Sequence, residues 1–103
     1  MAKGYWVATV DVTDPEGYKR YMAEVGNAFR QYGGRYLMRG GKSERVEGEG
    51  PLRIVVIEFK DYETALACHR SPEYAKARAL RVGNAVANII ITEGYEGRSP
   101  ASD

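Results

Sequence analysis

The sequence predicts a single α+β domain of four strands and two helical regions. Short aliphatic runs at residues 54–57 and 89–91 have the length of strands. Between residues 18 and 32, apolar side chains recur every three or four positions, as they do on one face of a helix. A proline follows a capping residue at Asp14-Pro15 and again at Ser71-Pro72, which is typical of the first turn of a helix.

The first strand is expected at Tyr5–Val12, where Trp6 and every second residue after it are apolar. Asp14 is expected to cap the following helix, with Pro15 in its first turn. This helix ends at Gly33-Gly34, because glycine adopts the left-handed cap conformation without steric cost. Its apolar stripe comprises Tyr18, Tyr21, Met22, Val25, Phe29 and Tyr32.

Two further strands are expected in the middle of the chain. A short strand runs from Arg35 to about Arg39. A glycine-rich, exposed connection follows over residues 40–51, and around residues 43–46 it can extend the strand. Leu52–Phe59 is the third strand, with an unbroken aliphatic centre.

The last third of the chain contains a broken helix and a final strand. Asp61 is expected to cap a helix that restarts at Ser71-Pro72 and continues to about Arg81. The last strand is expected at Ala87–Tyr95. The domain therefore spans residues 1–96, and the small, polar residues 97–103 are expected to form a disordered tail.

These elements follow the order β-α-β-β-α-β, which is the ferredoxin-like arrangement with an antiparallel sheet. Both helical regions cover one face of that sheet and leave the other face bare. Val7, Ile54 and Val56 are expected on the bare face, where apolar side chains indicate an interaction surface. A second copy related by a two-fold axis is the simplest cover for such a face. We therefore expect a homodimer through the open sheet face.

The charge balance argues against several classes of partner. The 103 residues include 15 basic and 14 acidic side chains, a formal net charge of +1. No net field attracts nucleic acid or anionic lipid, so we expect neither a nucleic-acid nor a membrane partner. The first six residues lack the apolar segment of a signal peptide, and Cys68 is the only cysteine. We therefore expect a cytoplasmic protein without disulfides.

Two binding motifs are incompatible with the residues at the positions that they require. Gly41-Lys42-Ser43 looks like the end of a phosphate-binding loop, but the glycine required five residues earlier is Tyr36. RNA-recognition domains share the expected topology, but they need stacking aromatic residues within the third strand. The only aromatic residue there is the terminal Phe59. No cysteine or histidine pattern predicts a metal site.

Polar residues are expected to gather at one edge of the sheet, where the first two strands end and the third begins. The second helical region ends at the same edge. Arginine binds carboxylates through two parallel hydrogen bonds, so this edge would suit a small organic acid. Ordinary surface ion pairs are the alternative interpretation. The residues concerned are Asp11, Arg39, Arg53 and His69, with Arg78 and Arg81 within reach.

Four of these residues have a role if the protein is an enzyme. His69 would act as general acid or base, because only histidine has an unperturbed pKa near neutrality. Asp11 would orient the imidazole or share its proton, and Arg39 and Arg81 would hold an anionic group. The structural alternative for His69 is a helix-end residue packed beside Leu66.

Several segments, in order along the chain, resemble the domain of unknown function 1330 family. The resemblance extends from about Lys3 to Gly94. It implies the dimeric α+β barrel superfamily, which includes cofactor-free monooxygenases, muconolactone isomerase-like enzymes and heme-dependent proteins. Members commonly hold a small molecule between sheet and helices. The matching segments are Gly4–Ala8, Val10–Pro15, Tyr32–Leu37, Arg39–Gly41, Glu47-Gly48, Val55–Phe59 and Ser71–Tyr74.

Three functions are compatible with these observations. The first is a cofactor-free enzyme, of isomerase or monooxygenase type, acting on a small organic molecule without a bound cofactor. The second is a non-catalytic module that binds or senses a small molecule in the same pocket. The third is a protein-interaction module that uses the bare sheet face.

Overall fold

The computed structural model describes residues 2–102 and contains one antiparallel sheet with helices on one side. The strands lie in the order β2-β3-β1-β4, and each neighbouring pair is antiparallel. This confirms the ferredoxin-like α+β fold. The elements are β1 (Gly4–Val12), α1 (Pro15–Gln31), β2 (Arg35–Arg39), β3 (Arg53–Phe59), α2 (Tyr62–His69), α3 (Pro72–Arg81), β4 (Ala85–Glu93) and a 3-10 turn at Pro100–Ser102.

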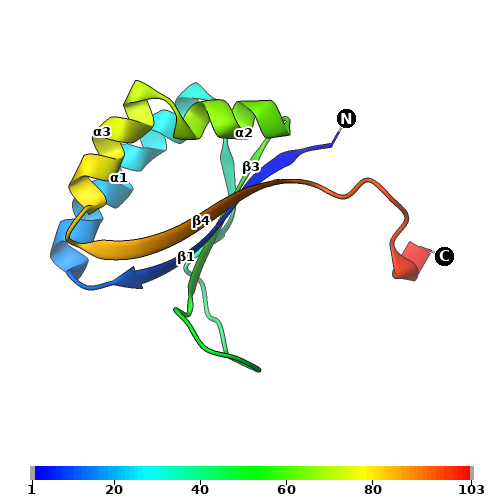
Figure 1. Cartoon of the computed structure of the whole chain (residues 1–103), viewed down its shortest axis with the longest axis horizontal. Coiled ribbons are helices and arrows are strands. Elements are labelled where there is room, and N and C mark those ends of the chain that lie inside the picture. Colours follow the sequence, from blue (N-terminus) through cyan, green and yellow to red (C-terminus); the bar gives the residue numbers. More distant parts are fainter. Residues whose placement is uncertain (1, 103) are drawn as a thin grey trace.

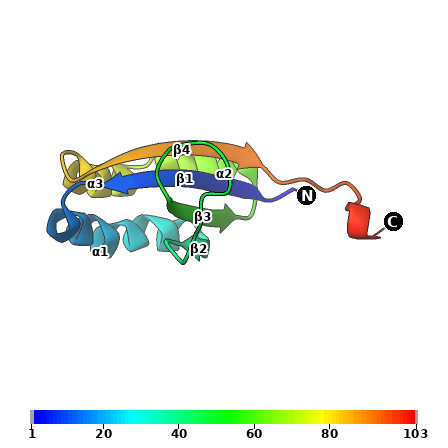
Figure 2. The ribbon, with the colours of Figure 1, turned by 90° about the horizontal axis from the view of Figure 1, so that it is seen from below.

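The three helices lie over the same face of the sheet (Figure 1). Helices α1 and α3 pack side by side, and α2 continues the α3 layer toward the far end of the sheet (Figure 2). In β1, Trp6, Ala8 and Val10 face the helices and are buried. In β3, Val55, Ile57 and Phe59 do the same. The alternation at period two therefore places the core between sheet and helices, as the sequence predicts.

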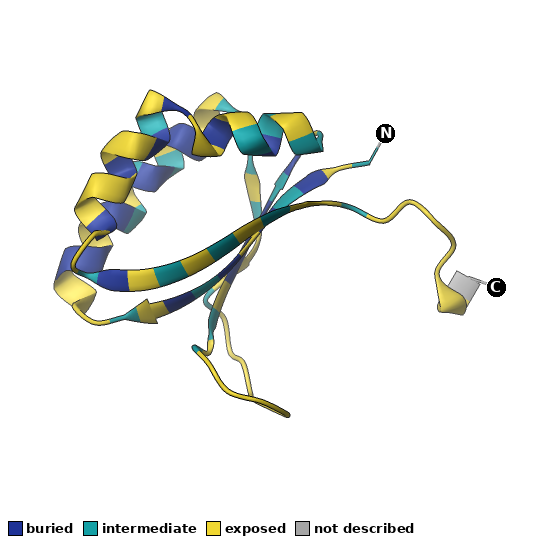
Figure 3. Cartoon of the chain, viewed as in Figure 1, coloured by how far each residue is buried: buried dark blue, intermediate teal, exposed yellow. Residues whose placement is uncertain are grey.

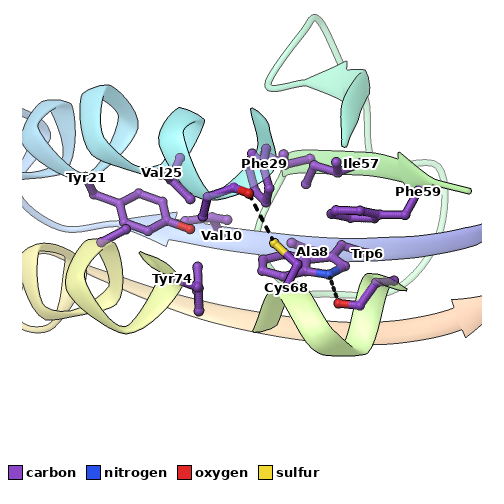
Figure 4. Packing of buried hydrophobic residues seen from close by; sticks show 14 of the residues in the cluster. Trp6, Ala8, Val10, Tyr21, Val25, Phe29, Ile57, Phe59, Cys68 and Tyr74 are labelled. Atoms are coloured by element: carbon purple, nitrogen blue, oxygen red, sulfur yellow. Dashed lines mark hydrogen bonds between the residues drawn. The ribbon is translucent and has the colours of Figure 1, made fainter. Parts of the chain in front are cut away.

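Trp6 lies at the centre of this core (Figure 4). Its ring makes edge contacts with Phe29 at 5.1 Å and with Tyr74 at 4.9 Å between ring centres. Its Nε1–H donates a hydrogen bond of 2.8 Å to the carbonyl oxygen of Ala65 in α2. The indole therefore joins β1 to all three helices.

The opposite face of the sheet carries a continuous apolar row. The strand register aligns Met38, Val56, Val7 and Ile90 across β2, β3, β1 and β4. Val7 and Ile54 are each 37% exposed, as expected for a bare face, and Ile90 is 67% exposed. Val56 faces the same side but is buried, since it lies between Val7 and Met38 in a central strand. Exposed positions alternate with covered ones along these strands (Figure 3).

Asp14 precedes α1, but its side chain makes no capping hydrogen bond, so the expected cap is wrong. The backbone N–H groups of Thr13 and Asp14 donate instead to the carbonyl oxygen of Asn84, each over 2.9 Å. The predicted caps at Asp61 and Ser71 are confirmed, because their side chains accept from Thr64 N and Tyr74 N.

Four strand boundaries differ from the expectation, and the first is the start of β1 at Gly4 in place of Tyr5. The pairing of Val12 with Ala85 starts β4 two residues earlier, and that strand ends at Glu93. Strand β3 begins at Arg53, and residues 43–46 form no strand. The C-terminal segment contains the 3-10 turn at its end, and Met1 and Asp103 lie outside the described residues.

Candidate functional site

A small cavity lies between the sheet and the α1–α3 layer. Its volume is about 20 Å³, which is enough for a water molecule. Its wall is almost entirely apolar and aromatic, apart from one guanidinium and the tyrosine hydroxyls. The lining residues include Trp6, Ala8, Val10, Tyr18, Tyr21, Met22, Tyr36, Arg81 and Ile89.

Arg81 is the charged residue of this wall. It belongs to the last turn of α3 and is only 9% exposed. Its guanidinium carbon lies 5.7 Å from the centre of the Tyr21 ring, and its Nε is buried without a hydrogen-bond partner. No acidic side chain among residues 2–102 forms an ion pair with it. A buried, unpaired charge is costly, so this arrangement is expected where a ligand supplies the counter-charge.

Arg53 lies at the edge of the same cavity. Its guanidinium carbon is 5.4 Å from the centre of the Tyr18 ring, and Nη2 is 4.0 Å from Met22 Sδ. Its Nε is also buried without a partner. Gly40 has φ of 67°, and a Cβ there would collide with the Arg53 guanidinium. The glycine therefore allows the backbone after β2 to pack closely against this arginine.

Arg39 is exposed and packs over the outer part of the cavity wall. Its guanidinium carbon lies 4.6 Å from the centre of the Tyr36 ring. Burial raises the pKa of Tyr36, and the charges of Arg39 and Arg53 act in the opposite direction. Tyr36 is therefore a neutral hydrogen-bond donor beside two positive charges.

Tyr21 lines the cavity, and Tyr74 of α3 packs nearby against Trp6 (Figure 4). Burial raises the pKa of Tyr21 strongly, and the nearby Tyr74 hydroxyl raises it further. The Tyr74 Oη is buried and has no partner in ordinary hydrogen-bond geometry within the described chain. The Tyr21 hydroxyl therefore stays protonated at neutral pH, so it can donate to an anion.

The buried side-chain nitrogen and oxygen atoms that lack a partner in the described chain are Arg53 Nε, Tyr74 Oη and Arg81 Nε. One of these atoms belongs to the cavity wall, and the other two belong to residues that pack against wall residues. Arg81 lines the cavity, Arg53 contacts Tyr18 and Met22 of its wall, and Tyr74 contacts Trp6. Unsatisfied buried polar groups are rare and need an explanation. These unsatisfied atoms therefore lie in the cavity wall or directly behind it.

His69 does not line the cavity. It lies at the end of α2 with its ring 5.5 Å from Trp6 and 5.0 Å from Tyr74, on the exposed side of these rings. Burial lowers its pKa, and the charges of Arg78, Arg81 and Arg70 lower it further. The imidazole is therefore neutral at pH 7, but two aromatic rings separate it from the cavity.

Asp11 lies on the other side of the sheet from His69. It alternates with Val10 and Val12 in β1, so its side chain is on the bare face. The structure does place Asp11, Arg39 and Arg53 at one sheet edge, but on different faces. The expected pairing of Asp11 with His69 is therefore absent from the geometry.

The break between α2 and α3 at Ser71-Pro72 decides whether His69 or Arg81 lies at the edge of the sheet. Because α2 has only eight residues, it ends above Trp6 and not at the edge. Helix α3 follows α2 and ends at Arg81, so Arg81 is the helix-end residue that lines the cavity. The tyrosines in and around the cavity wall belong to no sequence motif; they are Tyr18, Tyr21, Tyr36 and Tyr74. The sequence indicates only that Tyr18 and Tyr21 share a helix stripe with apolar residues.

Residues 2–102 contain neither a cluster of metal ligands nor a membrane-spanning helix. No three or more histidine, cysteine, aspartate or glutamate side chains are grouped for a metal ion. No helix there has the length and apolarity needed to cross a bilayer. Cys68 is buried, with its Sγ 3.7 Å from the carbonyl oxygen of Ala28, and burial raises its pKa to about 12.

Comparison with known proteins identifies the family. Residues 3–95 match the profile of the domain of unknown function DUF1330. The chain belongs to this family. A comparison with functionally curated proteins finds no match. The DUF1330 fold is therefore established here, whereas the family description supplies no reaction.

Solved structures show how widely this DUF1330 fold is shared. A protein of unknown function from Rhodopseudomonas palustris is 17% identical with a TM-score of 0.73, over 93% of this chain and 85% of that one. SnoaB, a cofactor-independent oxygenase from Streptomyces nogalater, is 12% identical with a TM-score of 0.63, over 100% of both chains. An ethyl tert-butyl ether D family protein from Bacillus halodurans is 14% identical with a TM-score of 0.58, over 92% and 100%. These similarities confirm the fold of the dimeric α+β barrel proteins.

Proposed function

We propose that this DUF1330 protein binds a small organic anion in the cavity between the sheet and helices α1 and α3. The observation that carries the proposal is the buried, unpaired guanidinium of Arg81 in an otherwise apolar wall. A carboxylate or enolate oxygen would supply the missing counter-charge and hydrogen-bond acceptor. Tyr21 and Tyr74 would donate further hydrogen bonds, and Arg39 would add positive charge from outside.

The ligand must displace part of the wall, because the cavity has a volume of only about 20 Å³. Met22 is the wall residue best suited to move. It is half-buried, and its unbranched thioether chain has three rotatable bonds. The apolar body of the ligand would then contact Val10, Trp6 and Ile89, which line the cavity.

Cofactor-free turnover of the bound anion is the second candidate. A cavity with positive charge and few competing waters stabilises a carbanion or enolate more than its neutral parent. The fold similarity to SnoaB, itself a cofactor-independent oxygenase, adds to this candidate. His69 remains a proposed proton-transfer residue only if a ligand extends beyond the Trp6 and Tyr74 rings. Asp11 lies on the opposite face of the sheet, so it takes no part in proton transfer inside this cavity.

The proposal is tested with hexanoate and benzoate, two monoanions with an apolar body. Trp6 is the only tryptophan and lines the cavity, so its emission reports binding directly. We expect both probes to change this emission, and Arg81→Gln to abolish the response. Arg30→Gln is the matched control, because it removes an exposed arginine from the far end of α1. An unchanged response in Arg81→Gln would contradict the proposed site.

Turnover and binding are distinguished by the mass of the recovered ligand. After incubation in air, an added oxygen atom or a changed structure in the ligand indicates an enzyme. An unchanged ligand, recovered quantitatively from a protein that binds it, indicates a binding or sensing module.

We also propose that two copies pair through the bare sheet face. The row of Met38, Val56, Val7 and Ile90 crosses all four strands, so it can meet the same row of a second copy about a two-fold axis. The next row on one side contains the Arg35–Glu58 ion pair and Tyr5, whose hydroxyl donates to Glu58. An apolar row bordered by polar groups is the usual composition of an interface.

A further inference from the structure

Two arginines flank one pair of packed tyrosines at the cavity. The rings of Tyr18 and Tyr21, both in the first turns of α1, lie 5.5 Å apart with an interplanar angle of 34°. Arg53, at the start of β3, lies over the Tyr18 ring, and Arg81, at the end of α3, lies over the Tyr21 ring. Two positive charges from separate elements therefore share one aromatic wall.

Both guanidiniums lack a counter-charge. In the described part of the chain, neither Arg53 nor Arg81 forms an ion pair, and the Nε of each is buried without an acceptor. Their close neighbours are aromatic ring faces, the Met22 sulfur and the backbone at Gly40. Cation–π contact holds a guanidinium in place but does not satisfy its N–H donors. Each arginine therefore retains donors for a separate anionic group.

We propose that the ligand of this cavity carries two anionic groups on a short apolar body, as a dicarboxylate does. Arg81 binds one group inside the cavity, and Arg53 binds the other at its edge. This inference rests on the proposed function, and it extends that function from one anionic group to two. Arginine suits both positions, because its planar fork pairs with both oxygens of a carboxylate.

Met22 and Gly40 explain how Arg53 can reach such a ligand. Met22 lines the cavity and contacts Arg53 through its sulfur, so its movement would join the Arg53 guanidinium to the cavity. Gly40 holds the chain after β2 against the opposite side of Arg53, where any Cβ would collide. Arg53 thus packs against both α1 and this turn, in contact with Met22 of the cavity wall.

The test compares two series of probes by isothermal titration calorimetry. One is the linear dicarboxylates from succinate to suberate, and the other is the monocarboxylates of the same chain lengths. At one chain length we expect the dicarboxylate to bind the unaltered protein at least about tenfold tighter than its monocarboxylate counterpart, because two guanidiniums are engaged. Arg53→Gln should reduce the affinity ratio of dicarboxylate to monocarboxylate to about one, without weakening the binding of the monocarboxylate. Arg81→Gln should weaken the binding of both series.

The controls separate charge from folding. Arg30→Gln removes an exposed arginine of α1 and should leave the ratio unchanged. Gly40→Ala displaces the Arg53 guanidinium without removing its charge, so it should also lower the affinity ratio of dicarboxylate to monocarboxylate. It serves as the second variant if Arg53→Gln lowers the melting temperature.

The outcomes distinguish this inference from the proposed function. Equal affinity of the two series in the unaltered protein, with both weakened by Arg81→Gln, would overturn the dianion and leave the anion site intact. A high ratio that survives Arg53→Gln would assign the second anionic group to another residue and overturn the role of Arg53. Absence of binding by both series would overturn the proposed function together with the inference.

Discussion

The Arg81 guanidinium carbon lies 5.7 Å from the centre of the Tyr21 ring, and no carboxylate of the described chain accompanies the pair. The ring face compensates only part of the cost of burying this charge. The unliganded protein therefore carries an electrostatic penalty at the position where ligand binding would relieve it.

Arg81→Met should stabilise the unliganded protein and abolish anion binding. Methionine fills a similar volume without a buried charge, and relief of an unpaired charge is expected to raise the free energy of unfolding by roughly 1 kcal/mol or more. Thermal melting without ligand measures the first effect, and Trp6 emission with hexanoate measures the second. A lower melting temperature would show that Arg81 serves the fold and not a ligand.

Trp6→Ala should destabilise the domain by about 3–5 kcal/mol, the usual cost of removing a large aromatic side chain from a core. The indole is 1% exposed and packs against Phe29, Phe59 and Tyr74. Trp6→Phe should cost less, because it keeps much of the packing and loses the hydrogen bond to Ala65 together with part of the ring volume. Urea unfolding followed by circular dichroism measures both variants. Similar losses in the two would assign the main role to the hydrogen bond.

His69 should make the protein less stable as the pH falls. Its pKa in the folded state is lowered by burial and by Arg78, Arg81 and Arg70, whereas the unfolded chain has the ordinary value of about 6.5. Between these two values the unfolded state binds more protons, so stability is complete above about pH 6.5 and is lost as the pH decreases. His69→Asn should flatten this part of the stability profile. The same slope in both proteins would refute the lowered pKa.

Cys68 should not react with alkylating reagents in the native protein. Burial raises the pKa of its thiol to about 12, so little thiolate exists at neutral pH. We expect iodoacetamide to modify Cys68 only after addition of denaturant, as measured by the mass of the intact protein. Rapid modification under native conditions would show that α2 opens locally at this position.

Val7→Asp should convert a homodimer into a monomer. Light scattering during size-exclusion chromatography should give twice the chain mass of 11.5 kDa for the unaltered protein and the single mass for the variant. Leu80→Asp is the matched control, because Leu80 on α3 is also 37% exposed but lies away from the sheet face. A monomer for the unaltered protein would leave the apolar row available to a different protein.

The fold was largely predictable from local signals. Alternation in β1 and β3, the stripe of α1 and the caps at Asp61 and Ser71 each agree with the structure. The hydrogen bonds before α1 were not predictable, because the N–H groups of Thr13 and Asp14 donate to Asn84, which lies 70 positions after Asp14 in the chain. Local patterns describe hydrogen bonds within a segment but not those that join distant segments.

The site was predictable only in part. Arg39, Arg53 and Arg81 border the cavity wall, as expected from the topology of the edge residues. His69 was misplaced because the length of α2 before the Ser71-Pro72 break decides which side chain reaches the edge. The tyrosine hydroxyls were missed because apolar periodicity treats tyrosine as a core residue. Its polar end becomes informative only when a cavity and an unpaired arginine are seen beside it.

The central position of β1 has a consequence for how the chain is made. The first strand of the sequence pairs along its length with the last, from Gly4 opposite Glu93 to Val12 opposite Ala85. During synthesis on the ribosome, Trp6 and its apolar neighbours must wait for nearly the whole chain before their second partner emerges. Such distant pairing slows folding and prolongs the time during which an unpaired strand edge can aggregate. Completion of the sheet is therefore expected only after β4 has emerged, as one cooperative step.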